Sequence, residues 1–457
     1  MTVNAGHRSA EEIGRTPHGR RPLPELGEQR KVADLAVADT ELGNGLRVLA
    51  VRKANVPTVE LRLRIPFGGT DPMHSARAEV LAETLLTGTA TRDRVAIDTE
   101  LALIGGELGT VVDPERLSVA GSALSSGLPT LLDVLADALT GAVYADAEVG
   151  RERDRLVERL AVARTQPGVI AREALQRRRY GDHPATREVP QADDVAEVTA
   201  EDVRALHRSA VLPRGSVLVL VGDIDPDSVI GDIDRALRGW SADATATPLA
   251  EVPDIDGGDL HLIARPGSVQ SQLRLSAQAV GRTDPRYAAL QLANLAYGGY
   301  FSSRLVENIR EDKGYTYGAQ SNFDFTGNAA TLVVSADTAS EVTAAALLET
   351  RYELARLGLV PPADAELESV RQYAIGTLLI STSSQGGLAG QLAALAGAGL
   401  DAGWLAAHPD RLSAVTAEQV AEAALEFFAP TKFTGVVVGD PDVVGTGLSA
   451  LGGVVRP

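Results

Sequence analysis

Two carboxylates stand one helical turn apart in the segment RAEVLAETLLTGT (77–89), namely Glu79 and Glu83. Side chains four residues apart lie on the same face of a helix, so these two carboxylates can act together. The spacing is that of a metal-binding helix, but zinc helices of this kind use two histidines. A solvated helix face is the ordinary alternative. A carboxylate site for Mg²⁺ or Ca²⁺ that includes His74 is another.

Composition limits the classes of function. The 457-residue chain has a formal net charge of -18, which argues against binding to nucleic acids or anionic membranes, because both require clustered Lys and Arg. The absence of cysteine excludes disulfides and thiol catalysis. Residues 1–36 lack the apolar core of a secretory signal and suggest a flexible extension. The apolar run at 216–222 is too short to span a bilayer. We expect a soluble cytoplasmic protein.

The chain contains an internal repeat. VTAEDV (198–203) returns as VTAEQV (415–420), and a Gly-Asp pair follows each at the same offset of 217 residues. Sequence periodicity of this kind indicates repeated structural units. The repeat predicts two homologous domains, over 37–240 and 258–457, joined by a linker at 241–257 that is rich in polar residues, Pro and Gly.

The elements that would hold these residues belong to an α+β fold. Residues 46–53 and 58–69 alternate between apolar and polar side chains, which predicts half-buried strands. Residues 339–358 predict a helix that ends at Gly358. Helix starts are indicated by N-cap and N3 pairs at Thr199 with Asp202 and at Thr416 with Gln419. Strands grouped apart from helices favour layered sheets over a doubly wound fold.

Several motifs together resemble one family. LGNGLRVLAVRKANVPTVELRLRIPFGG, TLLTGT, YGDHP and SSRLVENIREDKGYTYGAQS are similar to segments of the pitrilysin/insulinase-type zinc peptidases, the inverzincins, and most of all to the processing-peptidase branch. The resemblance covers nearly everything after residue 37. It implies two homologous domains, each a mostly antiparallel sheet packed with helices, that together form half of a clamshell.

The resemblance also implies that the family's zinc ligands and general base are replaced in this chain. The active helix of the family carries H-x-x-E-H, in which two histidines bind zinc and the glutamate is the general base. The matching positions here are Glu79, Ala82 and Glu83, and the third ligand position, 76 residues further on, is Arg159. The more distant acidic support is retained as Glu152. We therefore expect no metal in this chain, and an ion-pair cluster of Arg159 with the two glutamates in place of zinc.

A pair of residues from the family's C-terminal domain is retained in this chain. The family's C-terminal domain supplies an Arg and a Tyr seven residues apart that reach the substrate at the zinc, and Arg310 and Tyr317 have this spacing. Guanidinium and phenol groups can stabilise a tetrahedral oxyanion. A helix-end salt bridge and a packed strand residue are the ordinary alternatives. Gly298 and Gly299 suggest a flexible, substrate-contacting loop beside the cleft.

The combination predicts the non-catalytic subunit of a heterodimeric zinc metalloendopeptidase that processes peptides. A homologous H-x-x-E-H partner would hold the zinc and the base, and this chain would add Arg310, Tyr317 and half of the substrate chamber. A non-proteolytic structural or peptide-binding scaffold subunit is the main alternative. A self-sufficient peptidase would require bound zinc in this chain. Leader-peptide processing and general peptide turnover are both compatible with the sequence.

Overall fold

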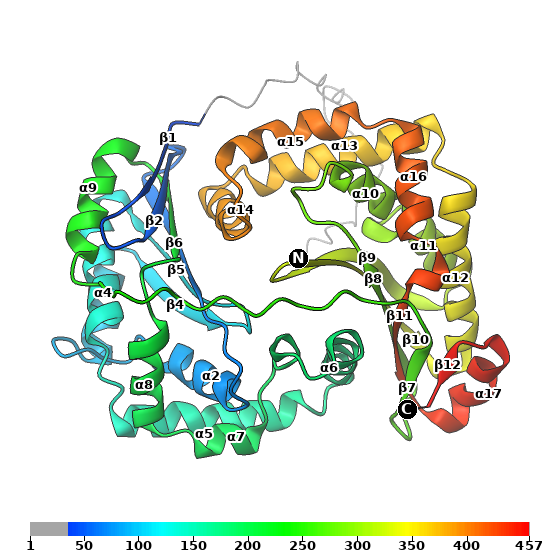
Figure 1. Ribbon diagram of the computed structural model, residues 1–457, viewed down its shortest axis with the longest axis horizontal. Helices are drawn as coiled ribbons and strands as arrows, with labels where there is room; N and C mark the ends of the chain where they lie inside the picture. Colours follow the sequence, from blue (N-terminus) through cyan, green and yellow to red (C-terminus); the bar gives the residue numbers. More distant parts are fainter. Residues whose placement is uncertain (1–34, 457) are drawn as a thin grey trace, which may run out of the picture. The chain divides into compact units, whose positions relative to one another are not determined.

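The computed structural model describes residues 35–456, so nearly all of the expected N-terminal extension (1–36) lies outside the described residues (Figure 1). The first half begins with a strand, and its strands and helices alternate irregularly. Its strands are β1 (Val37–Glu41), β2 (Arg47–Arg52), β3 (Thr58–Pro66), β4 (Glu107–Val112), β5 (Arg116–Leu124) and β6 (Val217–Gly222). Its α-helices are α2 (His74–Thr84), α3 (Arg94–Leu103), α4 (Leu128–Gly141), α5 (Asp146–Ala163), α6 (Pro167–Tyr180), α7 (Ala192–Glu197), α8 (Ala200–Ala210) and α9 (Pro226–Leu237).

The first sheet has six strands among the described residues, in the order β1-β2-β6-β3-β5-β4. β2 and β6 are parallel, whereas β3 is antiparallel to both β5 and β6. The central strand β3 alternates strictly between buried and partly exposed residues, because successive side chains of a strand point to opposite faces. The buried set, Val59 to Ile65, packs with Leu81 of α2 and Leu135 of α4 in the first core.

The second half repeats this strand order. Its strands are β7 (Leu260–Ala264), β8 (Gln270–Gln278), β9 (Thr316–Thr326), β10 (Ala329–Ala339), β11 (Thr434–Gly439) and β12 (Val454–Val455), arranged as β12-β7-β11-β8-β10-β9. Its α-helices are α10 (Tyr287–Asn294), α11 (Arg304–Val306), α12 (Thr343–Leu359), α13 (Asp364–Ser381), α14 (Gln385–Gly397), α15 (Ala402–Ala414), α16 (Ala417–Phe427) and α17 (Pro441–Leu451). The α+β class with two mixed sheets is therefore confirmed; the boundaries 37–240, 241–257 and 258–457 stay a prediction.

Local sequence signals account for several helix starts. Thr199 and Asp202 form a complete capping box at the start of α8, and Thr416 and Gln419 form another at the start of α16. In each box the hydroxyl accepts a backbone N–H while the N3 side chain accepts the backbone N–H of the cap residue, which satisfies two donors left free at a helix start. The expected helix 339–358 is α12, preceded by a 3₁₀ turn.

Each half lends one helix to the sheet of the other half. α6 packs on β8 and β11 of the second sheet, and α14 packs on β3 and β6 of the first. Figure 1 shows α14, in orange, beside the blue and green strands β2 and β6. The two helices occupy equivalent places in the repeat, since α6 follows α5 and α14 follows α13. Non-local packing therefore joins the two halves in addition to the chain itself.

The segment between the halves is anchored at intervals by single buried residues. Residues 241–258 contain no helix or strand, yet Leu249, Val252 and Ile255 are buried with Tyr180 in a small apolar cluster. The backbone N–H of Val252 donates to the Asn328 side chain at 2.8 Å. The segment therefore has fixed contacts on its way to β7. Within residues 35–456 no helix is long and apolar enough to cross a membrane.

Candidate functional site

The α2 helix carries the two glutamates on its partly exposed face. Its other face is buried: Val80, Leu81 and Ala82 lie in the first core. Ala82 is 4% exposed, and its carbonyl accepts a hydrogen bond from the Thr110 hydroxyl on β4 at 2.5 Å. The position that matches the family's general base is thus an apolar residue packed toward the edge strand β4.

Arg159 reaches across from α5 to α2. Its guanidinium donates to Glu83 Oε1 at 2.5 Å, with side-chain exposures of 53% and 33%. This contact joins the positions of the second histidine and the third ligand of the family pattern. Glu152, one heptad earlier on α5, is buried and pairs with Arg94 at 2.7 Å.

Glu79 has an unusual environment. Burial is the main cause that raises its pKa from 4.5 to about 7, and the negative charge of Glu83 adds to it, while Arg159 opposes the shift. Glu79 also lines a small pocket, about 20 Å³ and enough for one water molecule, together with His74, Asp113, Arg187 and Glu188. A carboxyl with such a pKa carries a proton for part of the time at neutral pH.

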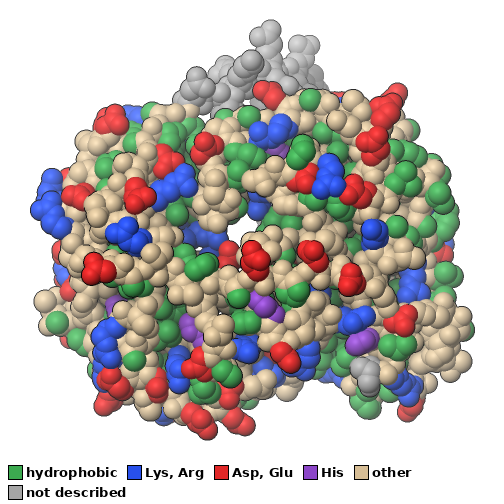
Figure 2. Space-filling model, in the orientation of Figure 1, with side chains coloured by type: hydrophobic (Ala, Val, Ile, Leu, Met, Phe, Trp, Pro, Cys, Tyr) green, Lys and Arg blue, Asp and Glu red, His purple; other side chains and the backbone are tan. Residues whose placement is uncertain are grey.

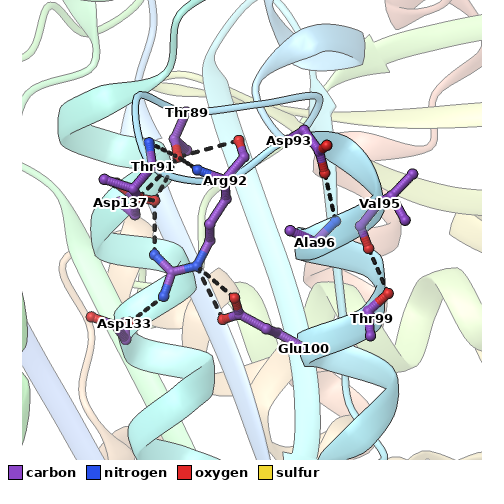
Figure 3. A network of polar contacts seen from close by, with 10 residues as sticks. All are labelled: Thr89, Thr91, Arg92, Asp93, Val95, Ala96, Thr99, Glu100, Asp133 and Asp137. Atoms are coloured by element: carbon purple, nitrogen blue, oxygen red, sulfur yellow. Dashed lines mark hydrogen bonds and ion pairs between the residues drawn. The ribbon is translucent and has the colours of Figure 1, made fainter.

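The turn after α2 is fixed by a polar network around Arg92 (Figure 3). The Arg92 guanidinium donates to Asp137 at 2.8 Å, to Glu100 at 3.0 Å and to Asp133. Asp137 also accepts from the Thr89 hydroxyl at 2.6 Å. These contacts tie the segment that follows α2 to α3 and α4.

These residues do not fit zinc. The zinc positions of the family pattern hold two carboxylates and a guanidinium, and the guanidinium would repel a cation. His74, the nearest imidazole in the sequence, bonds through Nε2 to the Phe67 carbonyl at 2.8 Å. No group of three or more His, Asp or Glu side chains within residues 35–456 is arranged to hold a metal ion.

Tyr317 lies at the start of β9 in the second half, and Arg310 lies in the turn before this strand. Tyr317 is 97% exposed. The register between β9 and β10 shifts between Ala336 and Thr338, so Tyr317 has no cross-strand partner, and bulges of this kind redirect side chains. Arg310 lies in a π-helical turn (Glu307–Asp312) and contacts Phe301 and Glu311. No hydrogen bond or ion pair of the described chain joins this pair to α2.

The expected glycine loop is wrong in its conformation. Gly298 and Gly299 end a π-helical turn (Leu295–Gly299), and Gly298 is buried. A Cβ atom on Gly298 would lie 3.0 Å from that of Ser321, and one on Gly299 would lie 2.8 Å from a Leu295 methyl. Ser321 of β9 crowds Gly298 and Leu295 of the same turn crowds Gly299, so a side chain at either position would meet these neighbours. Sequence alone does not reveal this, because a π turn depends on tertiary contacts. Contact of the two glycines with a substrate stays a prediction.

Family models identify the class of protein to which this fold belongs. Residues 47–193 match the family described as Insulinase (Peptidase family M16), and residues 197–373 match the Peptidase M16 inactive domain. The chain belongs to the M16 (insulinase) peptidase family.

Individual proteins that are similar to this chain also carry descriptions from this family. An uncharacterized zinc protease of Streptomyces coelicolor is 28% identical over 62% of this chain, and the match spans 64% of that protein. A Bacillus subtilis protein of the same description is 24% identical over 75% of this chain and 83% of its own length. The crystal structure of a peptidase M16 inactive domain from Pseudomonas fluorescens superposes with a TM-score of 0.82 at 23% identity, over 89% of this chain and 98% of that one.

Proposed function

We propose that this chain is the non-catalytic subunit of a heterodimeric zinc metalloendopeptidase that processes peptides. The observation that carries the proposal is the Arg159–Glu83 ion pair, which joins two of the expected zinc-ligand positions. Ala82, at the position of the base, cannot accept a proton. Catalysis by this fold therefore requires zinc, water and a base from another chain, a homologue with H-x-x-E-H.

The second support is the exposure of Tyr317. A phenol that is 97% exposed in a strand bulge, with no hydrogen bond within the described residues, is free to donate to a group outside this chain. Arg310 is seven residues before Tyr317 in sequence and is only partly exposed. We assign both to the partner's active site, where their donors would stabilise the oxyanion that forms when a peptide carbonyl is attacked.

The substrate would bind as an extended strand. β4 is an edge of the first sheet and pairs only with β5 among the described strands, so its outer backbone groups can pair with a peptide. It lies beside α2, which the Thr110–Ala82 contact shows directly. The net charge of -18 does not define an acidic face in Figure 2, where acidic and basic side chains are interspersed. Peptide charge is therefore a weak basis for naming the substrate.

The proposal is tested by mixing this chain with a homologous chain that carries H-x-x-E-H. The neighbouring gene is the first place to look for such a homologue. Cleavage of quenched fluorogenic peptides is expected only from the mixture, and zinc chelation should abolish it. Tyr317→Phe should lower kcat about 100-fold, as the loss of one oxyanion donor does elsewhere. Tyr352→Phe, at a tyrosine 54% exposed on α12, is the matched control and should behave as wild type. Cleavage by this chain alone would contradict the proposal.

The second candidate is a scaffold subunit without proteolytic activity. It is favoured by the Peptidase M16 inactive domain match over residues 197–373. A relative from Arabidopsis thaliana is named "Probable mitochondrial-processing peptidase subunit beta, mitochondrial" and is 23% identical over 57% of this chain and 50% of its own length. A stable complex with the H-x-x-E-H homologue whose cleavage rate is the same with Tyr317→Phe would favour the scaffold. Under both proposed functions we expect the protein to be cytoplasmic.

A further inference from the structure

Arg310 is stacked on an aromatic ring. Its guanidinium carbon lies 4.4 Å from the centroid of the Phe301 ring, which is 63% exposed. Such a contact is attractive because the ring face carries partial negative charge. The other charged contact of this guanidinium within residues 35–456 is Glu311, the next residue, at 3.3 Å. A pair between exposed neighbours fixes orientation weakly, since both side chains keep rotational freedom.

The ring itself is held by the loop that carries it. Phe301 lies between the π turns Leu295–Gly299 and Glu307–Asp312, and such turns are rare in proteins and frequent at functional sites. The preceding Tyr300 packs on Tyr373 of α13, with ring centroids 4.9 Å apart. The backbone N–H of Ser303 donates to the Tyr300 carbonyl at 3.2 Å. The loop is thus anchored on both sides of Phe301.

The contact with Phe301 leaves the N–H donors of the Arg310 guanidinium uncovered by the ring. The ring lies against the central carbon of the guanidinium, whereas the N–H donors point outward at the edge of that planar group. An arginine held in this way can still donate to a carbonyl or an oxyanion. The Glu311 contact at 3.3 Å engages Nη1 alone and leaves the other N–H donors of Arg310 available.

We propose that Phe301 is a positioning residue for Arg310: its ring fixes the plane of the guanidinium so that the donors face the substrate at the partner's zinc. This inference rests on the proposed function for its catalytic consequence. The stacking itself is a property of this chain alone, so the two can be tested separately.

The first experiment needs no partner. In the full chain, the Nε–H resonance of Arg310, assigned by its loss in Arg310→Lys, should be shifted upfield by the ring current of Phe301. Phe301→Leu should remove the shift, and Phe301→Tyr should keep it. An Arg310 resonance that is the same in wild type and Phe301→Leu would overturn the inference, whatever the chain's function.

The second experiment uses the two-chain mixture. Because an exposed cation–π contact is worth about 0.5–1 kcal/mol, Phe301→Leu should lower kcat by about two- to fivefold with little change in KM. Phe301→Tyr should restore the rate, and Phe301→Leu should have no effect in an Arg310→Ala background. Tyr352→Leu is the control for loss of an exposed ring. If Arg310→Ala is impaired but Phe301→Leu equals wild type, the inference fails and the proposed function stands. If the mixture does not cleave at all, the proposed function fails.

Discussion

At the scale of single residues, Glu79 is the group whose environment departs most from what its sequence position suggests. The sequence shows a carboxylate one turn from another, which is usually a solvated pair. In the structure Glu79 is partly buried and lines a small pocket, whereas Glu83 has the guanidinium of Arg159. The pair is therefore asymmetric: Glu83 has a counter-charge in contact, and Glu79 does not.

This asymmetry predicts a pH dependence of stability. The pKa of Glu79 is raised to about 7 by burial, while an unfolded glutamate titrates near 4.5. Between these values the folded chain holds a proton that the unfolded chain has lost, so stability falls as pH rises from about 4.5 to 7. Glu79→Gln should remove this loss and stabilise the protein at pH 8 by up to about 3 kcal/mol, with little effect at pH 4. Denaturant unfolding across pH measures it.

Two variants act as controls for this assignment. Glu158→Gln, at an exposed glutamate of α5, should leave the pH profile unchanged. Arg159→Ala removes the positive charge that opposes the shift, so a carboxyl titration by NMR should place the Glu79 midpoint above its wild-type value. The Arg159–Glu83 pair is exposed, and its loss should cost less than about 1 kcal/mol. Equal pH profiles for wild type and Glu79→Gln would contradict the assignment.

At the scale of elements, the Arg92 network holds the turn that ends α2. The Arg92 side chain is 16% exposed and serves three carboxylates from α3 and α4. Arg92→Ala leaves Asp137, itself 17% exposed, beside Asp133 without a counter-charge. The expected loss of stability is about 2 kcal/mol, between the values for exposed and fully buried pairs. Faster hydrogen exchange of the amides at 87–92 should accompany it.

The control for this element is an arginine that also pairs with a carboxylate but is exposed to solvent. Arg151→Ala removes an arginine that is 59% exposed and pairs with Glu148 on α5. It should change the free energy of unfolding by no more than about 0.5 kcal/mol. An Arg92→Ala variant as stable as Arg151→Ala would show that the turn is held by its apolar neighbours.

Elements with strong local signals were predictable, and those set by distant contacts were not. Residues 46–53 and 58–69 form β2 and β3 as their alternation indicates, and both capping boxes form because their partners are three residues apart. Gly298 and Gly299 were assigned to a loop, because nothing local reports the approach of Ser321. The contact of Phe301 with Arg310 joins residues nine apart across α11 and the π turn Glu307–Asp312, and it leaves no periodic signal. The burial that perturbs Glu79 depends on elements from elsewhere in the chain.

At the scale of the described chain, the exchange of α6 and α14 is the feature that sequence could not disclose. The pattern of 167–180 shows that one face is apolar, but not which sheet covers it. In the structure the buried Arg179 of α6 pairs with Asp324 at 2.7 Å and bonds to Thr331 at 2.8 Å, both on the second sheet. On the other side, Leu388 and Leu392 of α14 pack with the first sheet in an apolar cluster.

This exchange predicts that the two halves stay together without a covalent link. A protease site inserted at Asp243–Thr245, a largely exposed stretch, would divide the chain between β6 and β7. The two fragments should co-elute at low micromolar concentration and separate only in denaturant, because separation exposes both apolar contacts and leaves the Arg179 charge without Asp324. Arg179→Ala in the cleaved protein should weaken the association, whereas Arg177→Ala, at an exposed arginine of the same helix, should weaken it much less. Fragments that separate under native conditions would mean that the connecting segment, and not the exchanged helices, holds the halves together.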